Sequence, residues 1–263
     1  MPPSDFVFEN SVTIKTKSLR SGVTGLAAES LTTGEFIYSY INFQGTSAGQ
    51  FYSSRDLVGA GGSAAASTPG WEFDPQIVAT ADGGYVVAYT AIRIEASSGA
   101  QTPGDIYIAK YGGTIEWGPS LIVSPGDVQP VHQPGTAQSY GTGESQPAIA
   151  ELPSGYIAIA FVAEGGIFAQ LRTADGAVIV QKAAVSAPVQ GNSSSPIISP
   201  LADGSFLIIW QSNGGNADAS DFDLLGQKMS AAGAKIGSEF KVNSVTLGSQ
   251  DSAASTVLEG GTT

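Results

Sequence analysis

The stretch "SPIISPLADGSFLIIWQS", from Ser195 to Ser212, has relatives elsewhere in the chain. "DPQIVATADGGYVVAYTA" begins at Asp74, and "QPAIAELPSGYIAIAFVA" begins at Gln146. The apolar residues recur at the same positions in these copies, whereas the polar residues differ. Each copy opens near a proline, continues into a short apolar segment and a Gly-centred turn, and then enters a second apolar run led by an aromatic residue. The chain therefore repeats one structural unit.

The second apolar run of each unit predicts a buried strand. Its leading aromatic residues align as Phe36, Tyr85, Tyr156 and Phe206, at separations of 49, 71 and 50 residues. The "ADGG" and "ADGS" pieces before two of them predict tight turns, because Asp-Gly readily adopts a positive φ. The runs "YVVAY", "YIAIAF" and "FLIIW" are almost continuously apolar and rich in β-branched and aromatic residues. They are too short for helices and are typical of strands buried on both faces.

A second hairpin follows in each unit. "GIFAQLRTADGAVIVQKAAV" shows it best, and "LLGQKMSAAGAKIGSEFKV" and "IYIAKYGGTIEWGPSLIV" repeat it, while "FYSSRDLVGAGG" in the first unit is a weaker version. Four strands at a period near 50 residues are typical of a propeller blade, whose two apolar faces are buried by neighbouring blades. No helical period is found. We therefore expect an all-β fold, a β-propeller of about five four-stranded blades.

The repeat divides a single domain, residues 1–263, into units at 23–70, 71–145, 146–194 and 195–250. Residues 251–263 begin a fifth unit, and "SVTIKTK" near the N-terminus resembles the outer strand "SEFKVNS". A partial blade of 251–263 with 1–22 is therefore expected, either shared between the chain termini or left incomplete. An incomplete blade would be completed by a neighbouring molecule, or the chain would be a fragment of a longer array.

The composition excludes several partners. Lys and Arg total 11 against 23 Asp and Glu, which gives a net charge of −12. Phosphate backbones would repel such a surface, so nucleic-acid binding is not expected. No apolar run is long enough to span a bilayer, and no membrane insertion is expected. The chain has no cysteine, which rules out disulfides and thiolate chemistry.

The unit from Ser195 to Ser244 resembles a repeat of large secreted bacterial proteins, the RTX-type and VCBS-type calcium-associated adhesins. Their repeats read roughly as "LADGGFVVVW", a Gly/Asp-rich loop and "GQRFDADGTKVGSEFQVNT", against "LADGSFLIIW" and "GQKMSAAGAKIGSEFKVNS" here. The match is close in this unit, moderate in the second and third units and poor in the first. The resemblance implies a bacterial protein that is secreted or on the cell surface, exported in one step, with an adhesive or scaffolding role.

One loop has the chemistry of a calcium site. "NGGNADASDFD" brings five oxygen-bearing side chains together within 11 residues, and calcium takes six to eight oxygen ligands. They are Asn213, Asn216, Asp218, Asp221 and Asp223. The spacing matches no established calcium loop, so the alternative is a solvated loop whose Asp and Asn residues form Asx turns.

Three residues are candidates for ligand binding. His132 is the single histidine, which argues against a zinc site, and it lies with Tyr140 in a long Pro- and Gly-containing insertion. Loops on a rigid scaffold often carry recognition, so this insertion could contact a partner or a glycan. Trp117, at a strand end in "GTIEWGPS", could stack on a sugar. Trp210 ends a buried run and is expected in the core.

No catalytic motif stands out. Asp74, Asp82 and Asp203 recur between units, but Asp82 and Asp203 belong to the repeated turns. We therefore expect a non-enzymatic structural or adhesive repeat protein without a certain cofactor, which could self-assemble into a homo-oligomer or filament by strand sharing. The first alternative is a carbohydrate-binding, lectin-like propeller that binds a surface glycan. The second is a five-bladed glycoside hydrolase, which would need carboxylates converging at the axis.

Overall fold

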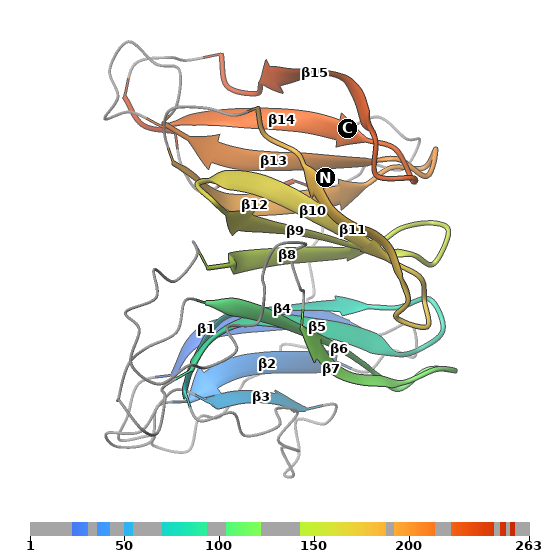
Figure 1. Ribbon diagram of the computed structural model, residues 1–263. Helices are drawn as coiled ribbons and strands as arrows, with labels where there is room; N and C mark the ends of the chain where they lie inside the picture. The colour runs from blue at the N-terminus through green and yellow to red at the C-terminus, as the bar shows by residue number, and fades with distance from the viewer. Residues whose placement is uncertain are drawn as a thin grey trace, which may run out of the picture.

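The computed structural model describes residues 23–30, 36–42, 50–54, 70–93, 104–121, 143–187, 192–213, 222–244, 248–250 and 253–255. These residues form antiparallel sheets and no helix (Figure 1). The first sheet has three strands in the order β1-β2-β3: β1(Val23–Ser30), β2(Phe36–Asn42) and β3(Gln50–Ser54). The second has the order β4-β5-β6-β7: β4(Gly70–Ala79), β5(Tyr85–Arg93), β6(Asp105–Tyr111) and β7(Trp117–Leu121).

The third and fourth sheets repeat this four-stranded plan. The third has the order β8-β9-β10-β11: β8(Ser145–Glu151), β9(Ile157–Ala163), β10(Gly166–Arg172) and β11(Val178–Ala184). The fourth has the order β12-β13-β14-β15: β12(Ser193–Pro200), β13(Phe206–Ser212), β14(Asp223–Met229) and β15(Lys235–Lys241). We refer to the four sheets as blades 1 to 4 in chain order.

The first strand of each blade lies next to the first strand of the following blade. β1 lies beside β4, β4 beside β8, and β8 beside β12. Figure 1 shows blade 4 uppermost, blade 3 beneath it, and blades 2 and 1 in the lower half. These first strands are therefore the inner strands of a propeller-like arrangement, as the period near 50 residues predicted.

The apolar core lies between the blades. One cluster joins Val86, Ala88 and Ile108 of blade 2 to Ile159 and Phe161 of blade 3, all with 0% exposure. A second cluster joins blade 3 to blade 4 through Leu171 and Trp210, also at 0%. The prediction that the second-strand runs are buried on both faces is confirmed for β5 and β9, because successive residues of these strands pack in different clusters. The prediction that Trp210 is a core residue is confirmed as well.

The turn in blade 3 shifts the expected alignment by one residue. Tyr85 pairs with Ala79 and Phe206 pairs with Pro200, but Glu151, the matching residue of β8, pairs with Ile157. Ile157 therefore occupies the position that the sequence had given to Tyr156. The shift arises because the turn "LPSGY" has a single Gly followed by Tyr156 in the place of Gly84.

The turns after β4, β8 and β12 have the same hydrogen bonds. In blade 2 the Thr80 N–H donates to the Gly84 carbonyl over 2.9 Å, and the Gly83 N–H donates to the Thr80 carbonyl over 3.0 Å. Leu152 and Leu201 make the equivalent bonds in blades 3 and 4. Gly83, Gly155 and Gly204 have φ between 78° and 84° at the same turn position, which only glycine adopts without strain.

A glycine in the outer hairpin of blade 3 and of blade 4 packs against the preceding blade. A Cβ at Gly176 would lie 2.9 Å from the Trp117 ring of blade 2, and a Cβ at Gly233 would lie 2.9 Å from Cγ2 of Val180 in blade 3. These glycines permit close approach between blades at the outer edge. The expected fourth strand of the first unit and the partial blade of 251–263 with 1–22 fall largely outside the described residues. Across the described part of the chain, no helix could cross a membrane.

If stability comes from the stacking of blades, a side chain between two blades should matter far more than one on the outer edge. Ile159→Ala, at 0% exposure, should lower the free energy of unfolding by about 2–5 kcal/mol, because it leaves a cavity between blades 2 and 3. Ile179→Ala, at 42% exposure on β11, should change it by less than about 0.5 kcal/mol. Chemical denaturation followed by tryptophan fluorescence measures both, and equal losses would contradict the stacking account.

Candidate functional site

The inner strands β4, β8 and β12 share an irregularity near their first residues. The register shifts between Phe73 and Gln76 in β4, and at the matching places in β8 and β12. One residue within each shift has a left-handed backbone: Asp74 at φ 49°, Gln146 at φ 52° and Ser195 at φ 52°. Such a conformation in a residue other than glycine costs on the order of 1 kcal/mol and is often found at functional sites.

Side chains link these bulges from blade to blade. The Ser195 N–H donates to Gln146 Oε1 over 2.7 Å, and the Gln146 N–H donates to Thr90 Oγ1 over 3.2 Å. Thr90 is the strand partner of Phe73, which directly precedes Asp74. A continuous belt therefore runs at one end of the inner strands from Asp74 in blade 2 to Ser195 in blade 4. We call this region the bulge end.

Asp74 provides an accessible carboxyl group at the bulge end. Its side chain is exposed, and the two hydrogen bonds of the belt do not involve its carboxyl group. Desolvation by its surroundings nevertheless raises its pKa above the ordinary value of 3.8. A carboxyl group that solvent can reach and whose pKa is raised is suited to proton transfer.

Glu144 supplies a second carboxyl group at this end. It lies two residues before Gln146 and is 4% exposed. Its N–H donates to the Gly104 carbonyl over 2.7 Å. A Cβ at Gly104 would lie 2.6 Å from the Glu144 carbonyl oxygen and 3.0 Å from Cγ2 of Thr90, so this glycine lets the segment before β8 reach the belt.

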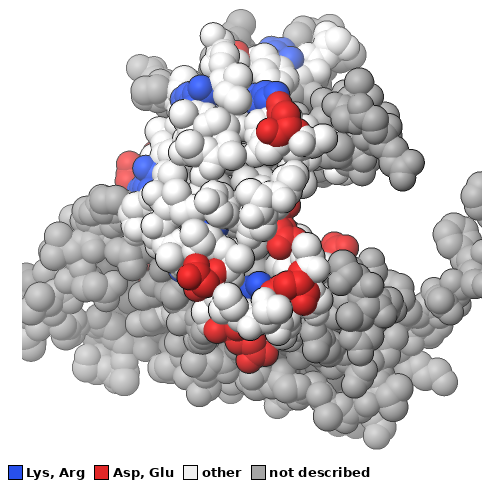
Figure 2. Space-filling model, turned by 90° about the vertical axis from the view of Figure 1, so that its right-hand side faces the viewer, with Lys and Arg blue, Asp and Glu red and all other residues white. Residues whose placement is uncertain are grey.

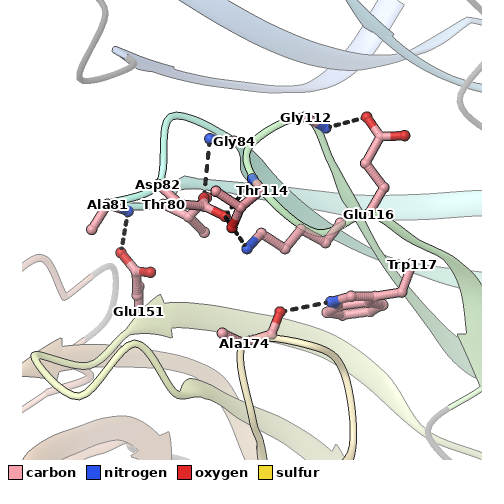
Figure 3. A network of polar contacts seen from close by, with 11 residues as sticks. Thr80, Ala81, Asp82, Gly84, Gly112, Thr114, Glu116, Trp117, Glu151 and Ala174 are labelled. Carbon is pink, nitrogen blue, oxygen red and sulfur yellow. Dashed lines mark hydrogen bonds and ion pairs between the residues drawn. The ribbon is translucent and has the colours of Figure 1, made fainter.

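At the opposite end of the inner strands, the carboxylates accept hydrogen bonds that stabilise the turns (Figure 3). Asp82 accepts hydrogen bonds from Lys110 Nζ over 2.8 Å, from the hydroxyls of Thr80 and Thr114, and from the N–H groups of Thr114 and Gly84. Burial raises the pKa of Asp82, but these donors outweigh it and hold the pKa well below its ordinary value of 3.8. Asp82 therefore closes the turn and carries no available proton.

Two further glutamates at this end are also engaged. Glu151 Oε2 accepts the Ala81 N–H over 2.7 Å, which ties blade 3 to blade 2 (Figure 3). Desolvation is the main reason that the pKa of Glu151 is raised, although the Ala81 hydrogen bond opposes it. Glu116 Oε1 accepts the Gly112 N–H over 2.6 Å within its own hairpin.

The Asp–Lys pair varies with the blade as a unit. Lys228 and Asp203 of blade 4 repeat the pair of blade 2, with Nζ and Oδ2 2.9 Å apart. In blade 3 the two matching positions hold Ser154 and Leu171, so both charges are replaced together. These recurring aspartates are turn residues, as the sequence predicted.

Of the three predicted ligand-binding residues, only Trp117 lies within the described residues. Its Nε1–H donates to the Ala174 carbonyl over 3.1 Å (Figure 3). The Arg172 guanidinium lies 5.8 Å from the centroid of the indole ring. Burial lowers the pKa of Arg172. The partly buried indole thus packs between blades 2 and 3. His132 and Tyr140 lie outside the described residues.

Two of the five predicted calcium ligands are described, and both contact protein groups. Asn213 Oδ1 accepts the Asn192 N–H over 2.6 Å. Asp223 is 4% exposed and lies 2.5 Å from Lys241 Nζ. Asn216, Asp218 and Asp221 lie outside the described residues. Within the ranges given above, no group of three or more His, Cys, Asp or Glu side chains could hold a metal ion.

The charged side chains of the described surface are dispersed. Figure 2 shows acidic and basic groups as separate spots on an otherwise uncharged face. Several acids lie next to lysines, as in the pair of Lys182 Nζ and Glu164 Oε1 at 2.8 Å. On this face, charge does not mark a broad docking surface.

Sequence reasoning missed Thr90, Glu144 and Gln146. The signal that could have found the belt is the residue before proline in β4, β8 and β12, in "DP", "QP" and "SP". Its importance depends on a left-handed backbone, which a proline motif does not specify.

No family model matches the chain, and no curated protein matches it. Solved structures do. A protein of unknown function from Dyadobacter fermentans DSM 18053 superposes with a TM-score of 0.58 at 12% identity, over 85% of this chain and 70% of that one. An α-L-arabinofuranosidase from Fusarium graminearum in complex with arabinobiose gives 0.52 at 10% identity, over 84% of this chain and 66% of that one.

An α-L-arabinanase from Penicillium chrysogenum in complex with arabinobiose gives a TM-score of 0.51 at 11% identity, over 83% of this chain and 66% of that one. This chain thus spans just under two thirds of each of the two enzymes. The similarity confirms the all-β, propeller-like fold. It also corrects the expectation of a non-enzymatic structural or adhesive protein, which is wrong because similar structures are glycoside hydrolases.

The two Asp–Lys pairs allow a matched test of the turn network. Asp82→Asn should lower the free energy of unfolding by about 3 kcal/mol at pH 7, because Lys110 is 2% exposed and would lose its carboxylate partner. Asp203→Asn should cost much less, because Lys228 is 35% exposed and stays hydrated. The double variant Asp82→Ser/Lys110→Leu, which copies blade 3, should recover most of the loss.

The same network predicts a pH dependence. Because the folded state lowers the pKa of Asp82, its contribution is present above the ordinary pKa of 3.8 and is lost as the pH falls toward the lowered value. The difference in unfolding free energy between wild type and Asp82→Asn should therefore be constant near neutral pH and shrink below about pH 4. Urea unfolding at several pH values measures it, and a difference that persists unchanged in acid would refute this role.

Proposed function

We propose that this protein is a glycoside hydrolase whose site lies at the bulge end of the inner strands. The observation that carries the proposal is the state of Asp74. It combines a left-handed backbone, an accessible carboxyl group and a raised pKa, whereas the turn-end acids Asp82, Glu116 and Glu151 accept backbone hydrogen bonds. Backbone strain is expected at a functional position when the side chain of the strained residue has no structural role.

The chemistry of glycoside hydrolysis supports this location. Most such enzymes use two carboxyl groups, one that exchanges a proton with the leaving group or water and one that acts as base or nucleophile. Asp74 is the proposed proton-transfer group, because a raised pKa brings it nearer to the working pH. Glu144 is the proposed second carboxyl group, since it comes from the next blade and reaches the same belt through Gly104.

Gln146 and Thr90 act as positioning residues in this proposal. Gln146 holds the bulge of blade 4 through the Ser195 N–H, and Thr90 holds the bulge of blade 3 through the Gln146 N–H. Both bonds fix the backbone around the carboxyl groups without using a carboxylate. A site on rigid inner strands keeps its groups in place during the reaction.

The comparisons support the substrate class. Two of the similar structures are an arabinofuranosidase and an arabinanase with arabinobiose bound, so arabinose-containing polysaccharides are the first substrates to test. We further propose a ring of about five blades, as the repeat period near 50 residues predicts. A polysaccharide substrate agrees with a secreted or cell-surface location.

The test is hydrolysis by the full chain and by Asp74→Asn. Wild-type protein should release reducing sugar from arabinan or arabino-oligosaccharides, and Asp74→Asn should lower kcat by at least about 100-fold with little change in KM. Because Asp74 must hold a proton to give to the leaving group, wild-type activity should fall as the pH rises through the raised pKa of Asp74. That alkaline limb should be absent from the residual activity of the variant.

Asp175→Asn is the matched control, because Asp175 lies in the outer hairpin turn of blade 3 with a fully solvated side chain. It should keep wild-type activity, and thermal unfolding should show that all three proteins are folded. A folded wild type that hydrolyses none of a panel of arabinans, arabino-oligosaccharides and sialosides would overturn the proposal. Equal activity of wild type and Asp74→Asn would overturn the assignment of the site.

A further inference from the structure

Blade 4 has an apolar face that points away from blade 3. Phe206, Ile208 and Trp210 of β13 pack in the cluster shared with blade 3. The alternate residues Leu207 and Ile209 therefore point to the opposite side, because side chains alternate along a strand. Leu224 of β14 lies on the same side, opposite Gln211, and β15 adds Ile236 and Phe240. We call this surface the outward face of blade 4.

In blades 2 and 3 the matching residues of the second strand are covered. In blade 2, Val86 and Ala88 hold the places of Leu207 and Ile209, and both are 0% exposed beneath blade 3. On the outward face, Ile209 is 8% exposed and Leu207 is partly buried, and Ile236 and Phe240 of the outermost strand are each 44% exposed. The sequence of blade 4 thus provides an apolar face that the described blades leave partly open.

The two Asp–Lys pairs also differ in exposure between blade 2 and blade 4. In blade 2 the side chains of Lys110 and Asp82 are 2% and 22% exposed. In blade 4 the equivalent Lys228 and Asp203 are 35% and 59% exposed. The geometry of the pair is the same, so the change in exposure reflects only what covers it.

The outer edge repeats the pattern a third time. The side chain at one position of the outermost strand receives the hairpin glycine of the next blade, as Trp117 receives Gly176 and Val180 receives Gly233. Ile236 is the corresponding residue of β15, because it pairs with Lys228 as Trp117 pairs with Lys110. No glycine of the described residues packs against Ile236 in this way.

A later segment of the same chain already lies on this blade. Ser255 Oγ is 2.5 Å from Ser199 Oγ on β12, and the Gln250 N–H donates to the Phe222 carbonyl over 2.8 Å. Asn243 Nδ2 bonds both Gln250 Oε1 and Asp223 Oδ1, which fastens the connection to blade 4. In the sequence, Ser255 follows Asp251 by four residues, as Ser199 follows the bulge residue Ser195.

We infer that the outward face of blade 4 docks a fifth sheet of the same chain, whose inner strand includes residues 253–255. The register of Ser199 with Ser255 is that of one inner strand beside the next. The exposed side chain of Ile236 occupies the position at which Trp117 and Val180 pack against the hairpin of the next blade. A second copy of the protein would first have to displace the segment that Ser199 and Phe222 hold.

The first arm of the test is a crosslink, which is clean because the chain has no cysteine. Ser199→Cys/Ser255→Cys should oxidise to a disulfide within one chain, seen by mass spectrometry of a monomer on a non-reducing gel. Ser230→Cys/Ser255→Cys is the control, because Ser230 lies in the outer hairpin turn of blade 4, and it should stay reduced. A crosslink between two chains, or none with the first pair, would overturn the inference.

The second arm measures whether the outward face is covered in solution. Ile236→Asp should lower the thermal midpoint by several degrees more than Ile115→Asp, although both isoleucines are 44% exposed among the described residues. Ile115 lies in a hairpin turn of blade 2, where no blade is expected to dock. Equal shifts for the two variants would show an uncovered face and overturn the inference, whatever the crosslink shows.

Discussion

The whole structure depends on the radial stacking of sheets that are apolar on both faces. No blade could bury both faces alone, because a single antiparallel sheet exposes at least one of them to water. Residues such as Val86 and Ile159 reach 0% exposure only where two blades meet. The requirement explains why the apolar letters of the repeat are kept: each blade has to fit two neighbours of nearly the same shape. It also explains why the outward face of blade 4 is unusual. Its residues are apolar as in the other blades, but none of the four described blades packs against it.

Polar groups serve the stacking in two different ways. At the turn end, an aspartate fixes the turn after the inner strand and neutralises a lysine that the next blade covers, as Asp82 does for Lys110. Blade 3 removes both charges together and places Leu171 in the core instead, which avoids an unpaired buried charge. At the outer edge, glycines let hairpins approach the preceding blade. The replacement of the Asp–Lys pair in blade 3 changes the side chains between two blades and keeps the way in which the blades stack.

The bulge end differs because its features exceed what stacking needs. The bulge residues Asp74, Gln146 and Ser195 have left-handed backbones, and neutral hydrogen bonds link Ser195 to Gln146 and Gln146 to Thr90. The carboxyl group of Asp74 remains accessible with a raised pKa. Known hydrolases with this fold show that the scaffold can support chemistry on sugars, and the proposed function places that chemistry where strain and an available carboxyl group coincide.

The sequence alone determined the class of fold, because apolar periodicity and Asp-Gly turns act locally and recur within each unit. It predicted the strands around Tyr85 and Phe206, the buried place of Trp210 and the structural role of Asp82. Alignment by letters erred by one residue at Tyr156, since the register is set by strand pairing with Glu151. Only the tertiary structure decided that Trp117 lies between two blades and that Asp74, Thr90 and Gln146 form one belt. Those contacts join residues from different strands and blades, and their meeting depends on backbone angles and packing that no short stretch of sequence encodes.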